Sequence, residues 1–264
     1  MVDAMIGTDM LRAQYGSPDN LAARQSLWQY RDGPPLVDLV LDRVPLGAVV
    51  ADVGCGNGMY LERLRRRGGN PRTIGLDRSE GMARTAAKHA RTVAADAQAL
   101  PLRRASVDVA LSLHMLYHVP DIGQAVAELR RVVRPGGRVL VATNGAGHTA
   151  ELKAILADAA RWVAGIEVNR DWDTSRFDTE IALAMLREVF DRVDVVPAGG
   201  PVQVPDPTIV MEYVASWPRD AAEPATDPMW TAIQAEVTRA VLAHFATEST
   251  LTVTSAAAVL VAHA

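Results

Sequence analysis

The sequence predicts an α/β fold in which helices cover both faces of a mostly parallel sheet. Short, β-branched apolar runs alternate with longer segments whose apolar residues recur at helical spacing. Glycines or an acidic residue close several of these runs, where a strand would give way to a loop. The 264 residues, 49% of them hydrophobic, are enough to bury a large core in one domain.

The first predicted strand, turn and helix lie within VVADVGCGNGMYLERL, residues 49–64. The run 48–51 is too short and too β-branched for a helix, and the leucines at 61 and 64 begin an amphipathic helix. Glycines between the two permit a tight turn and let backbone N–H groups approach a ligand. The loop consists of Gly54, Cys55, Gly56, Asn57 and Gly58. Because the N-terminus of the following helix favours negative charge, this unit predicts a nucleotide-type cradle.

Two details of the loop argue against a dinucleotide. A dinucleotide fingerprint places its third glycine three positions after the second, where this chain has Met59. Asp52 puts a negative charge before the first glycine, which suits a cationic amino-acid head group better than a pyrophosphate. S-adenosylmethionine combines adenosine with an amino acid and carries no phosphate, so it is the predicted cofactor.

Further landmarks follow in order along the chain. Predicted strands cover 72–76, 92–95 and 107–113, and a helix over 121–133 leads through Pro135-Gly136-Gly137 into a fifth strand. The second strand ends at Asp77, where a carboxylate can accept both hydroxyls of a ribose. The third strand ends at Asp96, and the fourth runs into His114.

Over residues 48–143 the sequence resembles the class I S-adenosylmethionine-dependent methyltransferases, particularly the small-molecule branch related to ubiquinone and menaquinone biosynthesis enzymes. The resemblance implies a Rossmann-like, doubly wound sheet of seven strands, mostly parallel with an antiparallel last strand. It also implies N-terminal helices and helical insertions that form a lid over the substrate.

The resemblance further implies a cofactor site with three parts. Asp52 and the glycine loop would hold the amino-acid end, Asp77 the ribose, and Asp96 with Ala97 the adenine. Residues of the N-terminal helices would touch the methionine end or the substrate, or would only pack. The expected cofactor contacts outside the glycine loop are Tyr15, Arg24, Asp52, Asp77, Arg78, Met82, Asp96, Ala97, Leu113, His114 and His118, with Tyr30 a further candidate.

A single domain is predicted over residues 1–264, with an N-terminal helical cap (1–46) and a cofactor-binding core (47–143). Two insertions, 144–178 and 197–249, lie where this architecture builds a substrate lid. The first insertion begins with a helix capped by Thr149, and a later helix over 180–188 is capped by Asp178 or Thr179. Strand six is expected over 192–196, helices around 209–217 and over 229–245, and strand seven over 251–262.

Histidines supply the candidates for acid–base chemistry. Methyl transfer from a sulfonium is an in-line displacement, so the protein mainly aligns the acceptor and excludes water. A general base helps where the acceptor is an alcohol or an ammonium group. His148, in a glycine-flanked turn after strand five, is the predicted base, and His114 is expected to line the reaction site. His118 is expected to anchor its loop, and no histidine spacing suggests a metal site.

Aromatic residues concentrate in the two insertions, where they either wall an apolar acceptor pocket or pack in helix cores. They are Trp162, Trp172, Phe177, Tyr213 and Trp217. Their clustering favours a moderately apolar small molecule from specialised or quinone-like metabolism as the acceptor.

Composition argues against several other classes of protein. The net charge is −4 and no dense basic stripe is present, which disfavours a nucleic-acid partner. No apolar run reaches membrane-spanning length and no signal peptide is evident, so the expected location is the cytoplasm. The single cysteine, Cys55, rules out an internal disulfide, and its place in the loop indicates packing.

Three alternatives remain open from the sequence: a nicotinamide-dependent oxidoreductase, an aminopropyl transferase, and a catalytically silent S-adenosylmethionine-binding protein. The first would want a later third glycine and no carboxylate at position 52. The second would want an acidic polyamine pocket. The sequence names neither the acceptor atom (oxygen, nitrogen or carbon) nor the oligomeric state.

Overall fold

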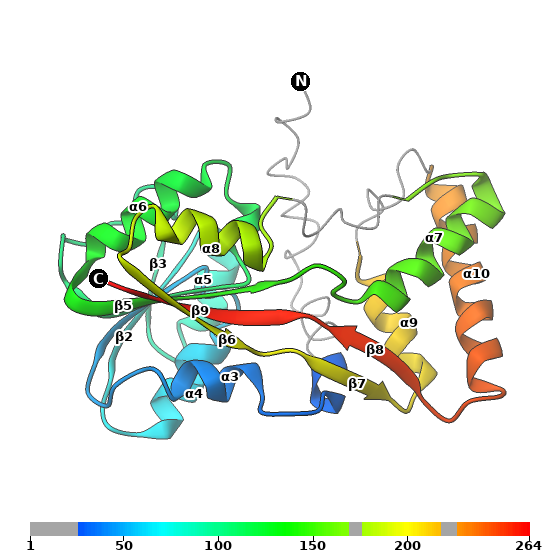
Figure 1. Ribbon diagram of the computed structural model, residues 1–264, viewed down its shortest axis with the longest axis horizontal. Coiled ribbons are helices and arrows are strands. Elements are labelled where there is room, and N and C mark those ends of the chain that lie inside the picture. Colours follow the sequence, from blue (N-terminus) through cyan, green and yellow to red (C-terminus); the bar gives the residue numbers. More distant parts are fainter. Residues whose placement is uncertain (1–25, 169–175, 218–225) are drawn as a thin grey trace.

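The computed structural model describes residues 26–168, 176–217 and 226–264 (Figure 1). The predicted cofactor contacts Tyr15 and Arg24, and the aromatic Trp172, lie outside the described residues.

The main sheet has seven strands in the order β3-β2-β1-β4-β5-β9-β6. Its parallel part consists of β1 (Val49–Val53), β2 (Arg72–Asp77), β3 (Arg91–Ala94), β4 (Val107–Leu113) and β5 (Val133–Asn144). The last strand, β9 (Ala257–His263), runs antiparallel between β5 and β6 (Arg192–Pro197). The predicted fold class, including the antiparallel last strand, is therefore confirmed.

Helices cover both faces of this sheet (Figure 1). On one face α6 (Ile122–Val132) and α8 (Thr179–Arg187) pack against β4, β5 and β9 through a core that includes Leu129 and Leu186. On the other face α3 (Leu36–Leu41) and α4 (Met59–Arg67) bury Val40, Leu41 and Leu64. The short α5 (Glu80–Ala86) connects β2 to β3. Asp121 and Asp178 cap α6 and α8 through their side chains, and the second of these caps was predicted.

Residues of the two insertions, together with the strand β8, form a second lobe with its own core. It contains α7 (Ala150–Ala164), α9 (Pro207–Ala215), α10 (Asp227–Phe245) and a two-stranded ribbon of β7 (Gly200–Val204) and β8 (Leu251–Ser255). Its core includes Leu152, Leu156, Val253 and Ile233. In Figure 1 the ribbon leaves one end of the main sheet, and α7, α9 and α10 gather beside it.

Three local predictions were wrong. The apolar run over 251–262 is not one strand: it divides into β8 and β9 at Ala256, where the backbone of Gly199 comes close to Ser255. The strand β7 was missed, because a segment beginning Gly-Pro carries a weak strand signal and depends on pairing with β8. Thr149 does not cap α7 with its side chain, since its hydroxyl donates to the carbonyl of His148.

Candidate active site

Asp52 lies near the carboxyl end of β1, between Gly75 of β2 and Leu111 of β4 in the sheet register. Only 1% of its surface is exposed, and its Oδ2 has no hydrogen-bond partner among the described residues. Burial, together with the nearby charge of Asp77, raises the pKa of Asp52 to about 7. A buried carboxyl without a hydrogen-bond partner is costly, and a nearby group of positive charge would lower that cost.

The glycine bend follows directly. The N–H groups of Gly54 and Cys55 donate to the carbonyl of Leu76 at 2.7 and 3.0 Å, which folds the bend back onto the end of β2. Gly54 has φ of +74°, and a Cβ there would lie 2.7 Å from Cγ of Met115. Gly58, with φ of +83°, immediately precedes α4. The bend therefore tolerates no side chain at Gly54 and leads directly into a helix N-terminus.

Cys55 and Asn57, the side chains within the bend, have structural contacts. Cys55 is buried against Leu61 and Ala86, and burial raises the pKa of its thiol, so it remains protonated. The Oδ1 of Asn57 accepts a hydrogen bond from the N–H of Met59 at the start of α4. The interpretation of Cys55 as a packing residue agrees with this environment.

Asp77, the last residue of β2, links the bend to α5. Its Oδ2 accepts a hydrogen bond from the N–H of Gly56 at 2.9 Å, and its Oδ1 accepts one from the N–H of Ser79 at 2.8 Å. Burial raises the pKa of Asp77, although these two bonds oppose the shift. Each carboxylate oxygen keeps a further acceptor position, which is what two ribose hydroxyls require. Two further predicted cofactor contacts follow Asp77 in the sequence: Arg78 is exposed, and Met82 is buried in α5.

Asp96 lies after β3 in the next loop along this edge of the sheet. It accepts hydrogen bonds from both the backbone N–H and the side-chain amide of Gln98, at 2.9 and 3.0 Å to Oδ1. Burial opposes its ionisation, but these bonds and the charge of Arg78 outweigh it and lower the pKa of Asp96. Ala97 is buried beside it. The structure thus brings Asp52, Asp77 and Asp96 to the carboxyl ends of three adjacent strands.

The end of β4 carries Leu113, His114 and His118. Leu113 is buried, and the N–H of His114 donates to the carbonyl of Ala142 at 2.8 Å. His114 has φ of +54°, a left-handed conformation that is costly for a residue with a Cβ and recurs at functional sites. Burial lowers its pKa to about 4. His118 ends a short 3-10 turn, with its ring edge-on to Tyr117.

His148, the predicted base, follows β5 and is only 4% exposed. Its ring stacks on Trp28 with centroids 5.0 Å apart, and its Nδ1 has no partner within the described part of the chain. Burial first, and then His114, Lys153 and Arg31, lower the pKa of His148 to about 3, although a hydrogen bond to the Ala256 backbone opposes them. A base should have a pKa near the working pH. The buried ring is therefore better matched to accepting a hydrogen bond than to holding a proton.

Several residues of this region were not predicted as site residues. Trp28 contacts both His148 and, edge-on, Tyr213 of the second lobe. Arg31 donates hydrogen bonds to the carbonyls of Ala198 and Pro34, and Tyr60 has its pKa raised by burial and by Asp52. No local motif marks Trp28 and Arg31, because their contacts with His148 and Ala198 join segments far apart in the sequence.

The predicted aromatic wall is only partly assembled. Trp162 is 79% exposed and lines a groove of about 390 Å³ between α7 and α10. This groove contains none of the strand-end carboxylates Asp52, Asp77 and Asp96. Phe177 is buried in the core of the main sheet. Tyr213 and Trp217 are buried in the second lobe, where Tyr213 reaches Trp28. Of the two interpretations that the sequence left open, core packing describes Phe177, Tyr213 and Trp217.

The described residues contain no group of three potential metal ligands. Within these same ranges, no helix combines the length and apolarity needed to cross a bilayer.

Comparison with known proteins agrees with this geometry. Residues 51–141 match the family model described as "Methyltransferase domain". A tRNA (carboxymethyluridine(34)-5-O)-methyltransferase of Arabidopsis thaliana is 39% identical over 113 residues, which are 40% of this chain and 26% of that protein. A ubiquinone biosynthesis O-methyltransferase of Methylococcus capsulatus is 37% identical over 118 residues, 42% of this chain and 49% of the relative. The matched region thus spans about half, or less, of the length of these relatives.

The crystal structure of an Anabaena variabilis protein, described as a "Putative methyltransferase from antibiotic biosynthesis pathway", shares the fold over a longer range. Its TM-score is 0.64 at 17% identity, covering 87% of this chain and 96% of the other. The strand order and the glycine bend agree with the fold of the class I S-adenosylmethionine-dependent methyltransferases. The chain carries a methyltransferase domain of this class, centred on residues 51–141, and the cofactor of the class is S-adenosylmethionine.

Proposed function

We propose that the protein transfers a methyl group from S-adenosylmethionine to a small-molecule acceptor bound between the main sheet and the second lobe. The observation that carries the proposal is Asp52, a buried carboxyl whose Oδ2 has no partner in the described chain and which adjoins the glycine bend. A cationic amino-acid head group supplies the missing charge, whereas a pyrophosphate would be repelled.

Each part of the cofactor is matched by a described group. Asp52 and the bend from Gly54 to Gly58 would hold the amino-acid end, Asp77 the ribose, and Asp96 with Ala97 the adenine. When bound, S-adenosylmethionine supplies an electrophilic methyl group on a good leaving group. The chain has only to orient the acceptor and keep water away, which is worth about 7–11 kcal/mol when alignment is ideal.

On the acceptor side, His114 directly follows the end of β4, and His148 comes shortly after the end of β5. Burial keeps both rings neutral. Burial keeps the His148 ring neutral, so one of its two ring nitrogens carries a lone pair that can accept a hydrogen bond. Nδ1 has no hydrogen-bond partner in the described chain, so it is the nitrogen we assign to this role. His148 would orient an acceptor through its O–H or N–H.

The cofactor assignment is tested at Asp77. Asp77→Ala should weaken S-adenosylhomocysteine binding about 100-fold or more, because two charge-assisted hydrogen bonds are lost. The shape-preserving Asp77→Asn should weaken binding as well. Isothermal titration calorimetry measures the change, and thermal melts check that the bend still folds. Wild-type affinity in both variants would refute the ribose assignment.

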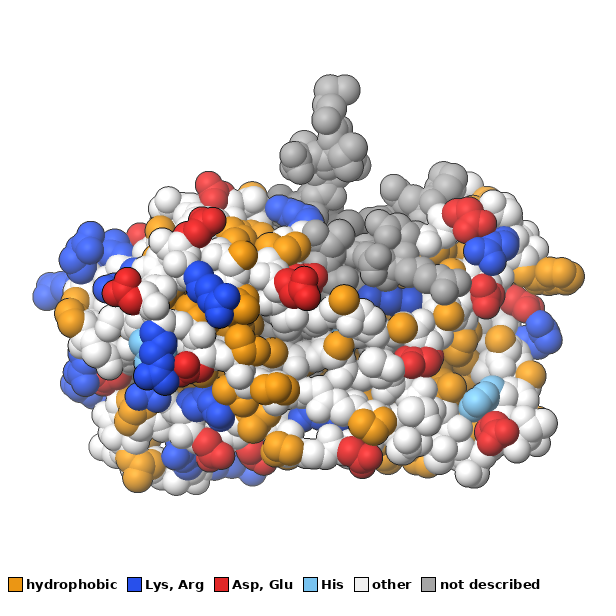
Figure 2. All heavy atoms as spheres, in the orientation of Figure 1, with side chains coloured by type: hydrophobic (Ala, Val, Ile, Leu, Met, Phe, Trp, Pro, Cys, Tyr) orange, Lys and Arg blue, Asp and Glu red, His pale blue; other side chains and the backbone are white. Residues whose placement is uncertain are grey.

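The acceptor class is tested by following release of S-adenosylhomocysteine with panels of phenols, amines, carboxylic acids and tRNA. On the face in Figure 2, basic and acidic side chains are interspersed rather than gathered into a basic stripe, and the net charge is −4. Both features favour a small molecule over tRNA. Methylation of tRNA alone would overturn this choice, and cofactor binding without any methylation would favour a catalytically silent protein.

A further inference from the structure

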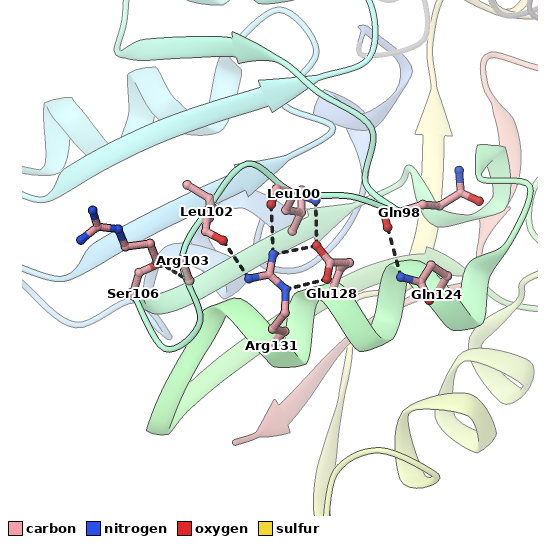
Figure 3. Close-up of polar contacts among 8 residues, drawn as sticks. All are labelled: Gln98, Leu100, Leu102, Arg103, Ser106, Gln124, Glu128 and Arg131. Atoms are coloured by element: carbon pink, nitrogen blue, oxygen red, sulfur yellow. Dashed lines mark hydrogen bonds and ion pairs between the residues drawn. The ribbon is translucent and has the colours of Figure 1, made fainter.

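The loop after β3, residues 96–102, forms neither helix nor strand, so no sheet neighbour fixes its backbone. Its polar groups bond instead to one face of α6 and its N-cap, as Figure 3 shows for most of them. That polar face consists of Asp121, Gln124, Glu128 and Arg131. These positions recur every three or four residues, which places them on one side of the helix, while Leu129 and its neighbours bury the other side.

Glu128 and Arg131 hold the far end of the loop. Arg131 forms a two-pronged ion pair with Glu128, Nε to Oε1 at 2.6 Å and Nη2 to Oε2 at 2.7 Å. The Oε2 of Glu128 accepts the N–H of Leu100 at 2.8 Å, and Arg131 donates to the carbonyls of Leu100 and Leu102 (Figure 3). Such planar, charge-assisted contacts give a fixed geometry rather than a loose attraction.

Gln98 holds the near end, and every polar group of its side chain is used. Its amide nitrogen donates to both oxygens of Asp96, at 3.0 and 3.2 Å, and its Oε1 accepts the N–H of Asp121 at 3.0 Å. The bond to Asp121 fixes which way the amide faces, because only the nitrogen is left to point at Asp96. The backbone carbonyl of Gln98 also accepts a hydrogen bond from the side-chain amide of Gln124.

We propose that Gln98 is a positioning residue for adenine recognition, which holds the Asp96 carboxylate in one orientation on a support provided by the polar face of α6. The inference rests on the proposed function, in which Asp96 accepts the adenine amino group. With its N–H and amide both directed at Asp96, Gln98 occupies Oδ1 and part of Oδ2 and leaves the remaining lone pairs in a fixed direction. A carboxylate held in this way selects a donor and rejects an acceptor at that position.

The test compares two ligands that differ at one edge of the purine: S-adenosylhomocysteine has an amino group at C6 and an acceptor nitrogen at N1, whereas S-inosylhomocysteine has a carbonyl oxygen at C6 and an N–H at N1. The measured quantity is the ratio of their dissociation constants by calorimetry. Wild type should prefer the adenosyl ligand strongly. Gln98→Met keeps the length of the side chain and removes its hydrogen bonds. This variant should lower the preference for the adenosyl ligand about tenfold, which is the effect of one charge-assisted hydrogen bond. The change should come mainly from weaker binding of the adenosyl ligand.

The matched control is Gln203→Met, the same chemical change at an exposed residue of β7 that bonds to Thr252 in the second lobe. It should leave the ratio at the wild-type value. A Gln98→Met ratio within twofold of wild type would overturn the inference. So would equal weakening of both ligands, since a merely structural role damages the whole site without changing the choice of base.

Failure of the proposed function would look different. If wild type binds neither ligand, the cofactor assignment itself is wrong. If Asp96→Asn lowers the preference for adenine while Gln98→Met does not, the function stands and Gln98 has no positioning role.

Discussion

At the scale of single residues, the site depends on where burial places charge. Asp52 is buried and its pKa is raised, whereas Asp96 accepts hydrogen bonds from Gln98 and its pKa is lowered. His148 is held neutral by burial against Trp28. The sequence shows these three groups only as titratable, and the structure gives each of them a different shift in pKa.

Asp52→Asn should change how stability depends on pH. The pKa of Asp52 is raised in the folded state, so its contribution favours folding at low pH and is lost as pH rises from about 4 to about 7. A shift of this size corresponds to about 4 kcal/mol. Urea unfolding at pH 5 and pH 8 should show the variant gaining stability relative to wild type at the higher pH. A pH-independent difference would contradict the raised pKa.

The same group governs cofactor affinity. Wild-type affinity for S-adenosylmethionine should fall as the pH is lowered from 8 to 6, because protonation removes the charge of Asp52. Asp52→Asn should bind weakly and lose that part of the pH dependence. Calorimetry at several pH values measures both, and an identical pH dependence in the two proteins would show that Asp52 does not face the cofactor.

Substitutions at His148 separate two chemical roles. His148→Asn keeps a hydrogen-bond acceptor near the position of Nδ1, whereas His148→Leu removes it. If the ring only accepts a hydrogen bond, turnover of an identified acceptor should fall about tenfold or less in the first and about 100-fold in the second. Cofactor affinity should stay near wild type in both. Equal collapse in the two variants would instead indicate proton transfer by His148.

At the scale of elements, the junction between β1 and α4 depends on close packing as well as on backbone conformation. Gly58 has φ of +83°, and a Cβ there would lie 2.9 Å from Cβ of Ala86 in α5. Gly165, which ends α7, has a similar left-handed conformation but open space around it. The pair separates backbone strain from steric conflict.

Gly165→Ala should therefore cost about 1 kcal/mol through strain alone. Gly58→Ala should cost about 2–4 kcal/mol, because overpacking against α5 adds to the strain. Denaturant unfolding measures both. Equal costs would mean that α5 moves aside without penalty.

At the scale of the whole molecule, the second lobe has a hydrophobic core of its own, separate from the clusters on the two faces of the main sheet. The predicted carboxylates lie at strand ends of the main sheet, whereas the core of the second lobe includes residues of β7 and β8. Within the described residues the chain passes between the main sheet and the second lobe after β5, at Ala198–Gly199 and at Ala256. The protein can therefore loosen the second lobe without opening the cofactor site.

Leu156→Ala removes a fully buried side chain from the second core and should cost about 2–5 kcal/mol. Hydrogen exchange should accelerate mainly in α7, α9 and α10, and cofactor affinity should change little. Leu129→Ala, the matched change in the core of the main sheet, should accelerate exchange in α6 and β4 instead. Uniform acceleration in both variants would show a single cooperative unit.

The sequence alone determined the order of β1 to β5, the glycine bend and the three strand-end carboxylates. Each of these is local: a β-branched run, a turn that needs glycine and an acidic residue at its end lie within a few residues of one another. Only the tertiary structure decided that β7 pairs with β8, that Phe177 packs in the core of the main sheet, and that burial beside Trp28 keeps His148 neutral. Strand pairing and the pKa of a buried ring depend on segments far apart in the chain, and periodicity along the sequence carries no record of that proximity.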